Sequence, residues 1–253
     1  MFQDVIDVVV GVGKGKLAFS KENPIGFLMA SILAGVFIGF GVLLAFTVSS
    51  TLPGVTFAKA LMGASFGIAL SLVVMAGAEL FTGNNFVLGV GLFRKEIGLA
   101  QVIKFWIVCY IGNWIGGILL AFLYSNTGLL TGPMAEVVSK AALAKTEIPF
   151  LALFIRGILC NVLVCLAVWC GIKMKSESGK LIMIFWCLYA FFTAGFEHSI
   201  ANMTLLSLEL MQPTSSIGFD GYFYNLLVVT LGNMVGGIYL VALPYAIIGR
   251  KKV

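Results

Sequence analysis

The sequence predicts an all-α membrane protein with six transmembrane helices, built as an inverted repeat of three plus three helices in which helices two and five are broken. Composition is the first observation that predicts this fold. Of the 253 residues, 60% are hydrophobic and 11% are charged, and the mean hydropathy is +1.06. Because a soluble domain has about 25% charged residues, this chain lacks the polar surface that a soluble protein needs.

The second observation is an internal repeat. The stretches GAELFTGN and GFEHSIAN share the frame Gly-x-Glu-x-x-x-x-Asn, and GNWIGG at 112–117 recurs as GNMVGG at 232–237, an offset of 120 residues. The matching residues of the first frame, 118 positions apart, are Gly77 and Gly195, Glu79 and Glu197, and Asn84 and Asn202. Two frames in the same order predict two copies of one unit of about 120 residues.

Apolar segments of at least about 18 residues mark the transmembrane helices. They are expected at about residues 26–48, 60–93, 102–124, 150–172, 181–210 and 222–248. The polar frames interrupt the second and the fifth. Residues 1–22 mix lysines and acids with apolar residues, which predicts an amphipathic helix on the membrane surface rather than a signal peptide. Residues 125–149 form the longest predicted loop.

The lysines and arginines predict the orientation. Three precede the first span, three lie between the second and third, three between the fourth and fifth, and three (Arg250, Lys251 and Lys252) close the chain, so 12 of the 16 share one side. Both termini are therefore expected in the cytoplasm, in a multi-pass protein of the plasma (inner) membrane. This bias accounts for the net charge of +5, so no nucleic-acid partner is expected.

Three spans per repeat require the two halves to be inserted in opposite senses. We expect one transmembrane channel domain, residues 1–253, with inverted repeats at about 22–125 and 145–249. The two breaks should meet near the midplane, because broken backbone is tolerated only where it faces protein or water. The glycine pairs of the second frame offer small faces for close helix contact.

His198 is the only histidine, and it follows Glu197 inside an apolar run. Ionisable groups at that depth are costly unless they face protein or a water-filled path, so we interpret this stretch as a pore or substrate site. An imidazole can donate a hydrogen bond or a proton to the anion of a weak acid. In the other break, Thr82 is either a hydrogen-bond donor to the solute or a helix cap.

Most of the other candidate residues have two open readings. Glu79 and Glu197 either support the broken helices or contact the substrate, whereas Asn84 and Asn202 are expected to support the broken helices. Either a pore constriction or ordinary packing is expected of four apolar residues, Leu80, Phe81, Phe66 and Phe191. Lys16 and Lys145 lie on opposite sides and either attract anions or anchor the interface.

Other chemistries are not supported by the sequence. All five cysteines lie in apolar runs without a Cys-x-x-Cys pair, so they are read as packing residues. No nucleotide-binding loop, hydrolase elbow or histidine-rich metal site is present. No cofactor, no metal and no enzymatic activity are expected.

Taken together, GAELFTGN, GFEHSIANM, CNVLVCLAVW at 160–169 and the GNxxGG repeats resemble the formate/nitrite transporter family over nearly the whole chain. The resemblance implies an aquaporin-like six-helix fold and a homopentamer with one pore per protomer. It also implies passage of small monovalent anions such as formate, nitrite or hydrosulfide through the lipid membrane.

The resemblance assigns roles residue by residue. His198 matches the central pore histidine, Thr82 the threonine of the broken second helix, and Asn161 the asparagine near that pair. Leu80 matches the cytoplasmic slit, Phe66 and Phe191 the outer slit, Lys16 the inner vestibule lysine and Lys145 a lysine at the outer mouth.

The substrate expected from the resemblance is hydrosulfide, with nitrite and formate also passing. The family's formate branch reads Gly-Ala-Asp-Leu-Phe-Thr-Ser-Thr where this chain has Glu79 and, after the threonine, Gly83-Asn84. The N-terminal segment and the short outer loops are most similar to the hydrosulfide channel, with the nitrite branch next. The alternative is a neutral-solute channel for water or glycerol, although the paired Asn-Pro-Ala signature of aquaporins is absent.

Overall fold

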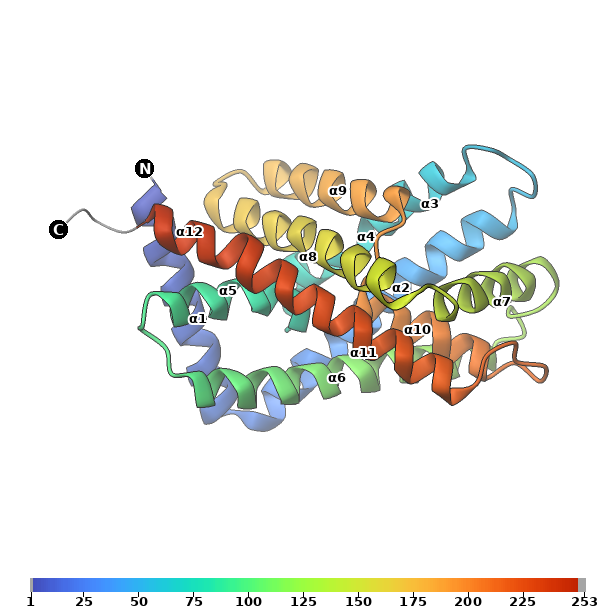
Figure 1. Ribbon diagram of the computed structural model, residues 1–253, viewed down its shortest axis with the longest axis horizontal. Coiled ribbons are helices and arrows are strands. Elements are labelled where there is room, and N and C mark those ends of the chain that lie inside the picture. The colour runs from blue at the N-terminus through green and yellow to red at the C-terminus, as the bar shows by residue number, and fades with distance from the viewer. Residues whose placement is uncertain (1, 250–253) are drawn as a thin grey trace.

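The computed structural model describes residues 2–249, and every regular element in this range is a helix (Figure 1). Arg250, Lys251 and Lys252, which support the predicted orientation, lie outside the described residues. The elements are α1 (Phe2–Glu22), α2 (Pro24–Ser50), α3 (Ala58–Phe66), α4 (Ile68–Leu72), the π-helix η1 (Val73–Gly77), α5 (Phe81–Phe93), α6 (Leu99–Ser125), α7 (Gly132–Thr146), α8 (Phe150–Lys173), α9 (Glu177–Ala194), α10 (Ser199–Leu210), α11 (Phe219–Val235), the π-helix η2 (Gly236–Ala242) and α12 (Leu243–Ile248).

Six spans are present, as predicted. Continuous helical runs at 24–50, 58–77, 99–125, 150–173 and 219–248 are long and apolar enough to cross a membrane, and the pair α9 and α10, bent by 54° at its break, makes the sixth. The second span also continues after its break as α5. In Figure 1, α1 and α12 lie at one end of the molecule, and the loops that precede α3 and follow α10 lie at the opposite end.

The two half-helices α5 and α10 lie inside the bundle. All residues from Phe81 to Gly91 and from Ser199 to Glu209 are buried. The half-helix α5 packs on η2 and α8 of the second half of the chain, and α10 packs on α6 and α2 of the first half. Each half therefore contributes its half-helix to the other, and the two form one core.

The GNxxGG glycines allow close helix contact, as predicted. A Cβ on Gly116 of α6 would lie 2.0 Å from the Ile32 carbonyl oxygen of α2, and one on Gly236 would lie 2.2 Å from the Ile158 carbonyl oxygen of α8. Only glycine permits such approach of two backbones. The pairs α2 with α6 and α8 with α11 are thus the matching close contacts of the two repeats.

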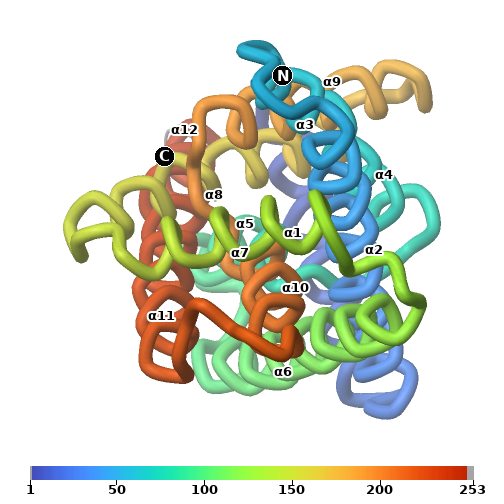
Figure 2. The backbone as a smooth tube through the Cα atoms, turned by 90° about the vertical axis from the view of Figure 1, so that its right-hand side faces the viewer, coloured from blue at the N-terminus to red at the C-terminus, as the bar shows by residue number. Residues whose placement is uncertain are grey.

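The segment predicted as the longest loop contains a helix, so that prediction is wrong. The helix α7 covers Gly132–Thr146 and buries Met134, Val138 and Ala142, which are four residues apart and so share one helical face. A search for long apolar spans misses it because it is short and amphipathic. Figure 2, viewed along the bundle, shows α7 crossing the end of the molecule in front of α10.

The N-terminal segment is helical and amphipathic, as predicted. In α1 the buried residues Ile6, Val9, Val10 and Gly13 lie on one face, and the helix packs mainly against α5. Its location at the membrane surface stays a prediction.

Candidate pore site

Both broken spans bend through the same backbone geometry. Gly77 and Gly195 have φ angles of +81° and +82°, in the left-handed region that glycine adopts without steric cost. The chain is then extended, and the half-helices begin after Leu80 and His198, which occupy equivalent positions of the repeat. The symmetry is therefore in the backbone, while the side chains at the cap position differ.

Two asparagines, one per repeat, hold these breaks. Asn113 of α6 accepts a hydrogen bond from the Phe81 N–H at 2.9 Å and donates to the Glu79 carbonyl at 2.9 Å. Asn233 of α11 accepts from the Ser199 N–H at 2.9 Å and donates to the Glu197 carbonyl at 2.9 Å. Because backbone groups in an apolar core must be paired, these amides replace the hydrogen bonds that each interrupted helix loses.

Glu79 and Glu197, the glutamates of the Gly-x-Glu-x-x-x-x-Asn frame, have equivalent hydrogen-bond partners in the two halves. Glu79 accepts hydrogen bonds from Asn84 at 2.9 Å and from Lys16 at 2.6 Å. In the second half, the Glu197 carboxylate accepts hydrogen bonds from Asn202 at 2.8 Å and from Lys145 at 2.7 Å. The Glu79 and Glu197 side chains are only 12% and 4% exposed, so their lysines are needed to balance a buried charge. Of the two open readings, these contacts favour support of the broken helices.

His198 and Thr82 meet between the two breaks. The His198 Nε2 atom lies 2.9 Å from the Thr82 hydroxyl oxygen, and Nδ1 accepts a hydrogen bond from the Ala201 N–H at 3.2 Å. In a neutral imidazole whose Nδ1 is an acceptor, the proton is on Nε2, so His198 donates to Thr82. The Thr82 hydroxyl hydrogen then remains free to donate. Both side chains are buried.

Asn161 of α8 lies beside this pair but contacts backbone. Its amide nitrogen donates to the Thr82 carbonyl at 3.3 Å and to the Asn233 carbonyl at 2.6 Å. Within residues 2–249 its side-chain oxygen has no hydrogen-bond partner. Asn161 thus connects the first turn of α5 to the end of α11, just before η2 begins at Gly236.

Two vestibules, named inner and outer after the predicted orientation, approach the pair of His198 and Thr82, and the inner one does so from the end of the molecule where α1 lies. It has a volume of about 400 Å³, and its lining includes Lys16, Glu79, Leu80 and Asn84. Its lining carries one basic and one acidic side chain, which are paired with each other.

An outer vestibule approaches from the opposite end and reaches His198. Its volume is about 300 Å³, and its charged lining residues are Lys59, Lys145, Arg156 and Glu197. Glu197 pairs with Lys145, whereas Lys59 and Arg156 have no ion-pair partner among residues 2–249. The outer vestibule therefore has an excess of two positive charges, which the inner vestibule lacks.

The predicted constriction residues differ in their position. The Phe191 ring lines the outer vestibule, stacks on His198 with centroids 6.0 Å apart and contacts the Phe66 ring at 5.6 Å. Phe66 itself is buried and lines neither vestibule. On the inner side Leu80 is 3% exposed and lines the vestibule. Phe81, another predicted constriction residue, packs against Tyr110 at 5.1 Å and lines neither vestibule. The reason is its position after the cap residue, which turns the side chain toward α6.

Sequence reasoning missed Asn113, Asn233, Lys59 and Arg156. The asparagines were detectable, because a polar residue recurs at equivalent positions in the middle of two apolar spans. The two cations gave no such signal. They are 97 residues apart in the chain, and only the packing of α3, α8 and α9 places them at one vestibule.

The fold and the candidate site together define a membrane transport protein in which two vestibules approach one buried polar pair from opposite ends. The formate/nitrite transporter family model matches residues 3–247, and the chain belongs to this family. As a member of a family of transporters and channels, it is not an enzyme.

Relatives agree with this assignment. The nitrite transporters NirC of Salmonella typhimurium and Escherichia coli are each 40% identical over 248 residues, which is 97% of this chain and 91% of theirs. A solved "FNT family ion channel" has a TM-score of 0.91 at 39% identity, covering 96% of this chain and 97% of that one. A "Pentameric formate channel with formate bound" has a TM-score of 0.80 at 28% identity, with coverage of 90% and 98%.

Proposed function

We propose that this protein passes small monovalent anions of weak acids through a pore centred on His198. The observation that carries the proposal is the buried pair of His198 and Thr82, which lies between two vestibules that open at opposite ends of the molecule. An anion gains more than a neutral solute from hydrogen-bond donors at this point, because hydrogen bonds to charged groups are the stronger ones.

The proposed mechanism follows from the hydrogen bonds of the pair. With Nδ1 occupied by the Ala201 N–H, the His198 proton polarises the Thr82 hydroxyl, whose own hydrogen is free for the solute. Passage of a bare anion through the apolar barrier of Leu80, Phe66 and Phe191 costs several kcal/mol. A hydrogen bond that the Thr82 hydroxyl donates to the anion at this point lowers that cost.

For the substrate, nitrite has the support of relatives named as nitrite transporters, and formate that of the solved formate channel. Hydrosulfide rests on the resemblance of the N-terminal segment and outer loops alone. We therefore propose all three as substrates. Their relative transport rates would assign the protein to a branch of the family.

The assembly proposed is a homopentamer in the plasma (inner) membrane with both termini in the cytoplasm. Its support is the likeness to the pentameric formate channel and the placement of α1 and α12 at one end (Figure 1). The whole chain, residues 1–253, would then be one channel domain, with repeats at about 22–125 and 145–249. The mass of the purified protein by native mass spectrometry tests the oligomer.

The experiment that tests the function is flux into proteoliposomes of hydrosulfide, nitrite, formate and glycerol, each with the wild type and with protein-free vesicles. We expect the three anions to enter and glycerol to be excluded. Glycerol flux without anion flux would instead show a neutral-solute channel and overturn the proposal.

A further inference from the structure

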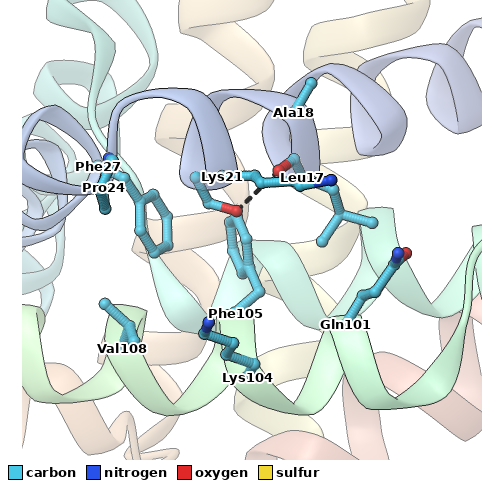
Figure 3. A pocket seen from close by; sticks show the side chains of 10 residues that line it. Leu17, Ala18, Lys21, Pro24, Phe27, Gln101, Lys104, Phe105 and Val108 are labelled. Atoms are coloured by element: carbon cyan, nitrogen blue, oxygen red, sulfur yellow. Dashed lines mark hydrogen bonds between the residues drawn. The ribbon is translucent and has the colours of Figure 1, made fainter.

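A cavity outside the pore lies between α1, the start of α2, and α6. It has a volume of about 580 Å³ and shares no lining residue with either vestibule. Its interior is apolar: Phe27 and Phe105 are each 2% exposed, and their ring centroids are 4.4 Å apart. Leu17 and Val108 complete this surface (Figure 3).

The polar lining residues of this cavity include two lysines. Lys21 comes from α1 and Lys104 from α6, and Gln101 lies one helical turn from Lys104 (Figure 3). No acidic side chain lines the cavity, and neither lysine has an ion-pair partner within residues 2–249. An apolar interior next to unpaired cations from two different helices is complementary to an amphiphile with an anionic head.

The position of the cavity fits a membrane ligand. Lys21 directly precedes the first span, and Lys104 lies in the first turns of the third, so both are at the membrane boundary on the side of the amino terminus. Basic pockets between membrane helices on the cytoplasmic side bind anionic lipid headgroups. The amphipathic helix α1 forms one wall and brings Leu17 over the apolar interior.

We propose that this cavity binds an anionic phospholipid. The phosphate is held between Lys21 and Lys104, Gln101 donates to a headgroup oxygen, and the first part of an acyl chain lies against Leu17, Phe27, Phe105 and Val108. The rest of the lipid extends into the bilayer. The bound lipid would connect α1 to α6 at a place where these two helices share few direct contacts.

The test is native mass spectrometry of the full-length protein titrated with phosphatidylglycerol or phosphatidylcholine of identical acyl chains. The double variant Lys21→Gln/Lys104→Gln should lose about tenfold or more in phosphatidylglycerol affinity, since each lysine near the surface contributes substantially to anionic lipid binding. Lys95→Asn/Lys175→Gln removes two charges from exposed positions outside the cavity and serves as the matched control. Asparagine suits position 95, where φ is +58°.

A second variant, Val108→Trp, fills the cavity without changing charge and should weaken binding as well. Equal losses in the cavity and control double variants would show general attraction of the lipid to a basic surface and overturn the site. If soluble glycerol phosphate competes for the cavity as effectively as the lipid does, the proposed contact between the acyl chain and the apolar interior is wrong. If Val108→Trp breaks the oligomer and leaves lipid binding unchanged, the cavity is a subunit contact and the proposal is wrong.

Discussion

The two ring nitrogens of His198 have different hydrogen-bond partners. Nδ1 caps α10 by accepting from the Ala201 N–H, and Nε2 meets Thr82. At the equivalent position of the first repeat, Leu80 starts α5 with no side-chain cap. The histidine therefore replaces an apolar residue at a point where the backbone does not require it, which argues for a role in transport.

Replacing His198 by asparagine separates these two roles. Asparagine is a good N-cap and keeps α10, but it is too short to reach the Thr82 hydroxyl. We expect anion flux in proteoliposomes to fall about 10- to 100-fold, the equivalent of losing a hydrogen bond to a charged group. Thermal stability in detergent should be nearly unchanged. Flux at the wild-type rate would remove His198 from the mechanism.

The Lys145 and Glu197 pair is expected to matter for stability. Lys145→Met leaves the 4%-exposed Glu197 carboxylate without its cation, which costs about 3–5 kcal/mol in buried pairs. Adding Glu197→Gln removes the uncompensated charge. Thermal unfolding of the two single variants and the double variant should show that the double is more stable than Lys145→Met. A double variant as unstable as the sum of the singles would contradict this coupling.

At the scale of elements, the broken spans depend on groups in neighbouring helices. Asn113→Leu would leave the Phe81 N–H unpaired and the Glu79 carbonyl with only the weak thiol donor of Cys109. An unpaired buried group costs about 1–3 kcal/mol, so a loss in this range is expected, and Asn233→Leu should lose a similar amount. Thermal unfolding in detergent measures both. The control is Asn126→Leu on the exposed end of α6, where little change is expected.

Close helix contact makes a second prediction for the elements. A Cβ on Gly116 meets the Ile32 carbonyl oxygen, whereas one on Gly171 has nothing within 4 Å. Gly116→Ala should destabilise by about 3 kcal/mol, at the upper end of overpacking costs, and lower the yield of folded protein. Gly171→Ala should be neutral or slightly stabilising. Equal melting temperatures for the two variants would show that α2 and α6 can separate without cost.

For the whole molecule, the exchange of half-helices explains why the two halves of the chain share one core. Because α5 packs on the second half of the chain and α10 on the first, neither half has a complete core alone. The proposed pore site lies where the two breaks meet, so it also requires both halves: Thr82 comes from one and His198 from the other.

The charge difference between the two vestibules is also a property of the whole molecule. With Lys16 and Lys145 each paired to a glutamate, the excess cations are Lys59 and Arg156 at the outer vestibule. Lys59→Gln/Arg156→Gln should lower anion uptake from the outer side several-fold at low salt, because a local positive potential raises the anion concentration. The control is Lys140→Gln, which removes the charge of a lysine outside the vestibule lining.

Salt provides the check on this explanation. The deficit of the double variant should largely disappear at high ionic strength, where exposed charges are screened over about 3 Å at 1 M salt. A deficit that persists at high salt would mean that Lys59 and Arg156 shape the pore rather than attract anions.

The sequence by itself determined the class of fold and the place of the two breaks, between which we propose the pore. Long apolar segments require a membrane, and the repeated Gly-x-Glu-x-x-x-x-Asn frame located both breaks. Both signals can be read from the sequence because the length and hydropathy of a span, and the polar residues that interrupt it, lie within one continuous segment. Only the tertiary structure decided which side chains meet. It placed the Asn113 and Asn233 amides on the breaks, brought Lys59 and Arg156 to one vestibule, turned Phe81 away from the pore, and formed α7 across the outer end. Those outcomes depend on packing between segments that are distant in the sequence, and periodicity and hydropathy describe only one segment at a time.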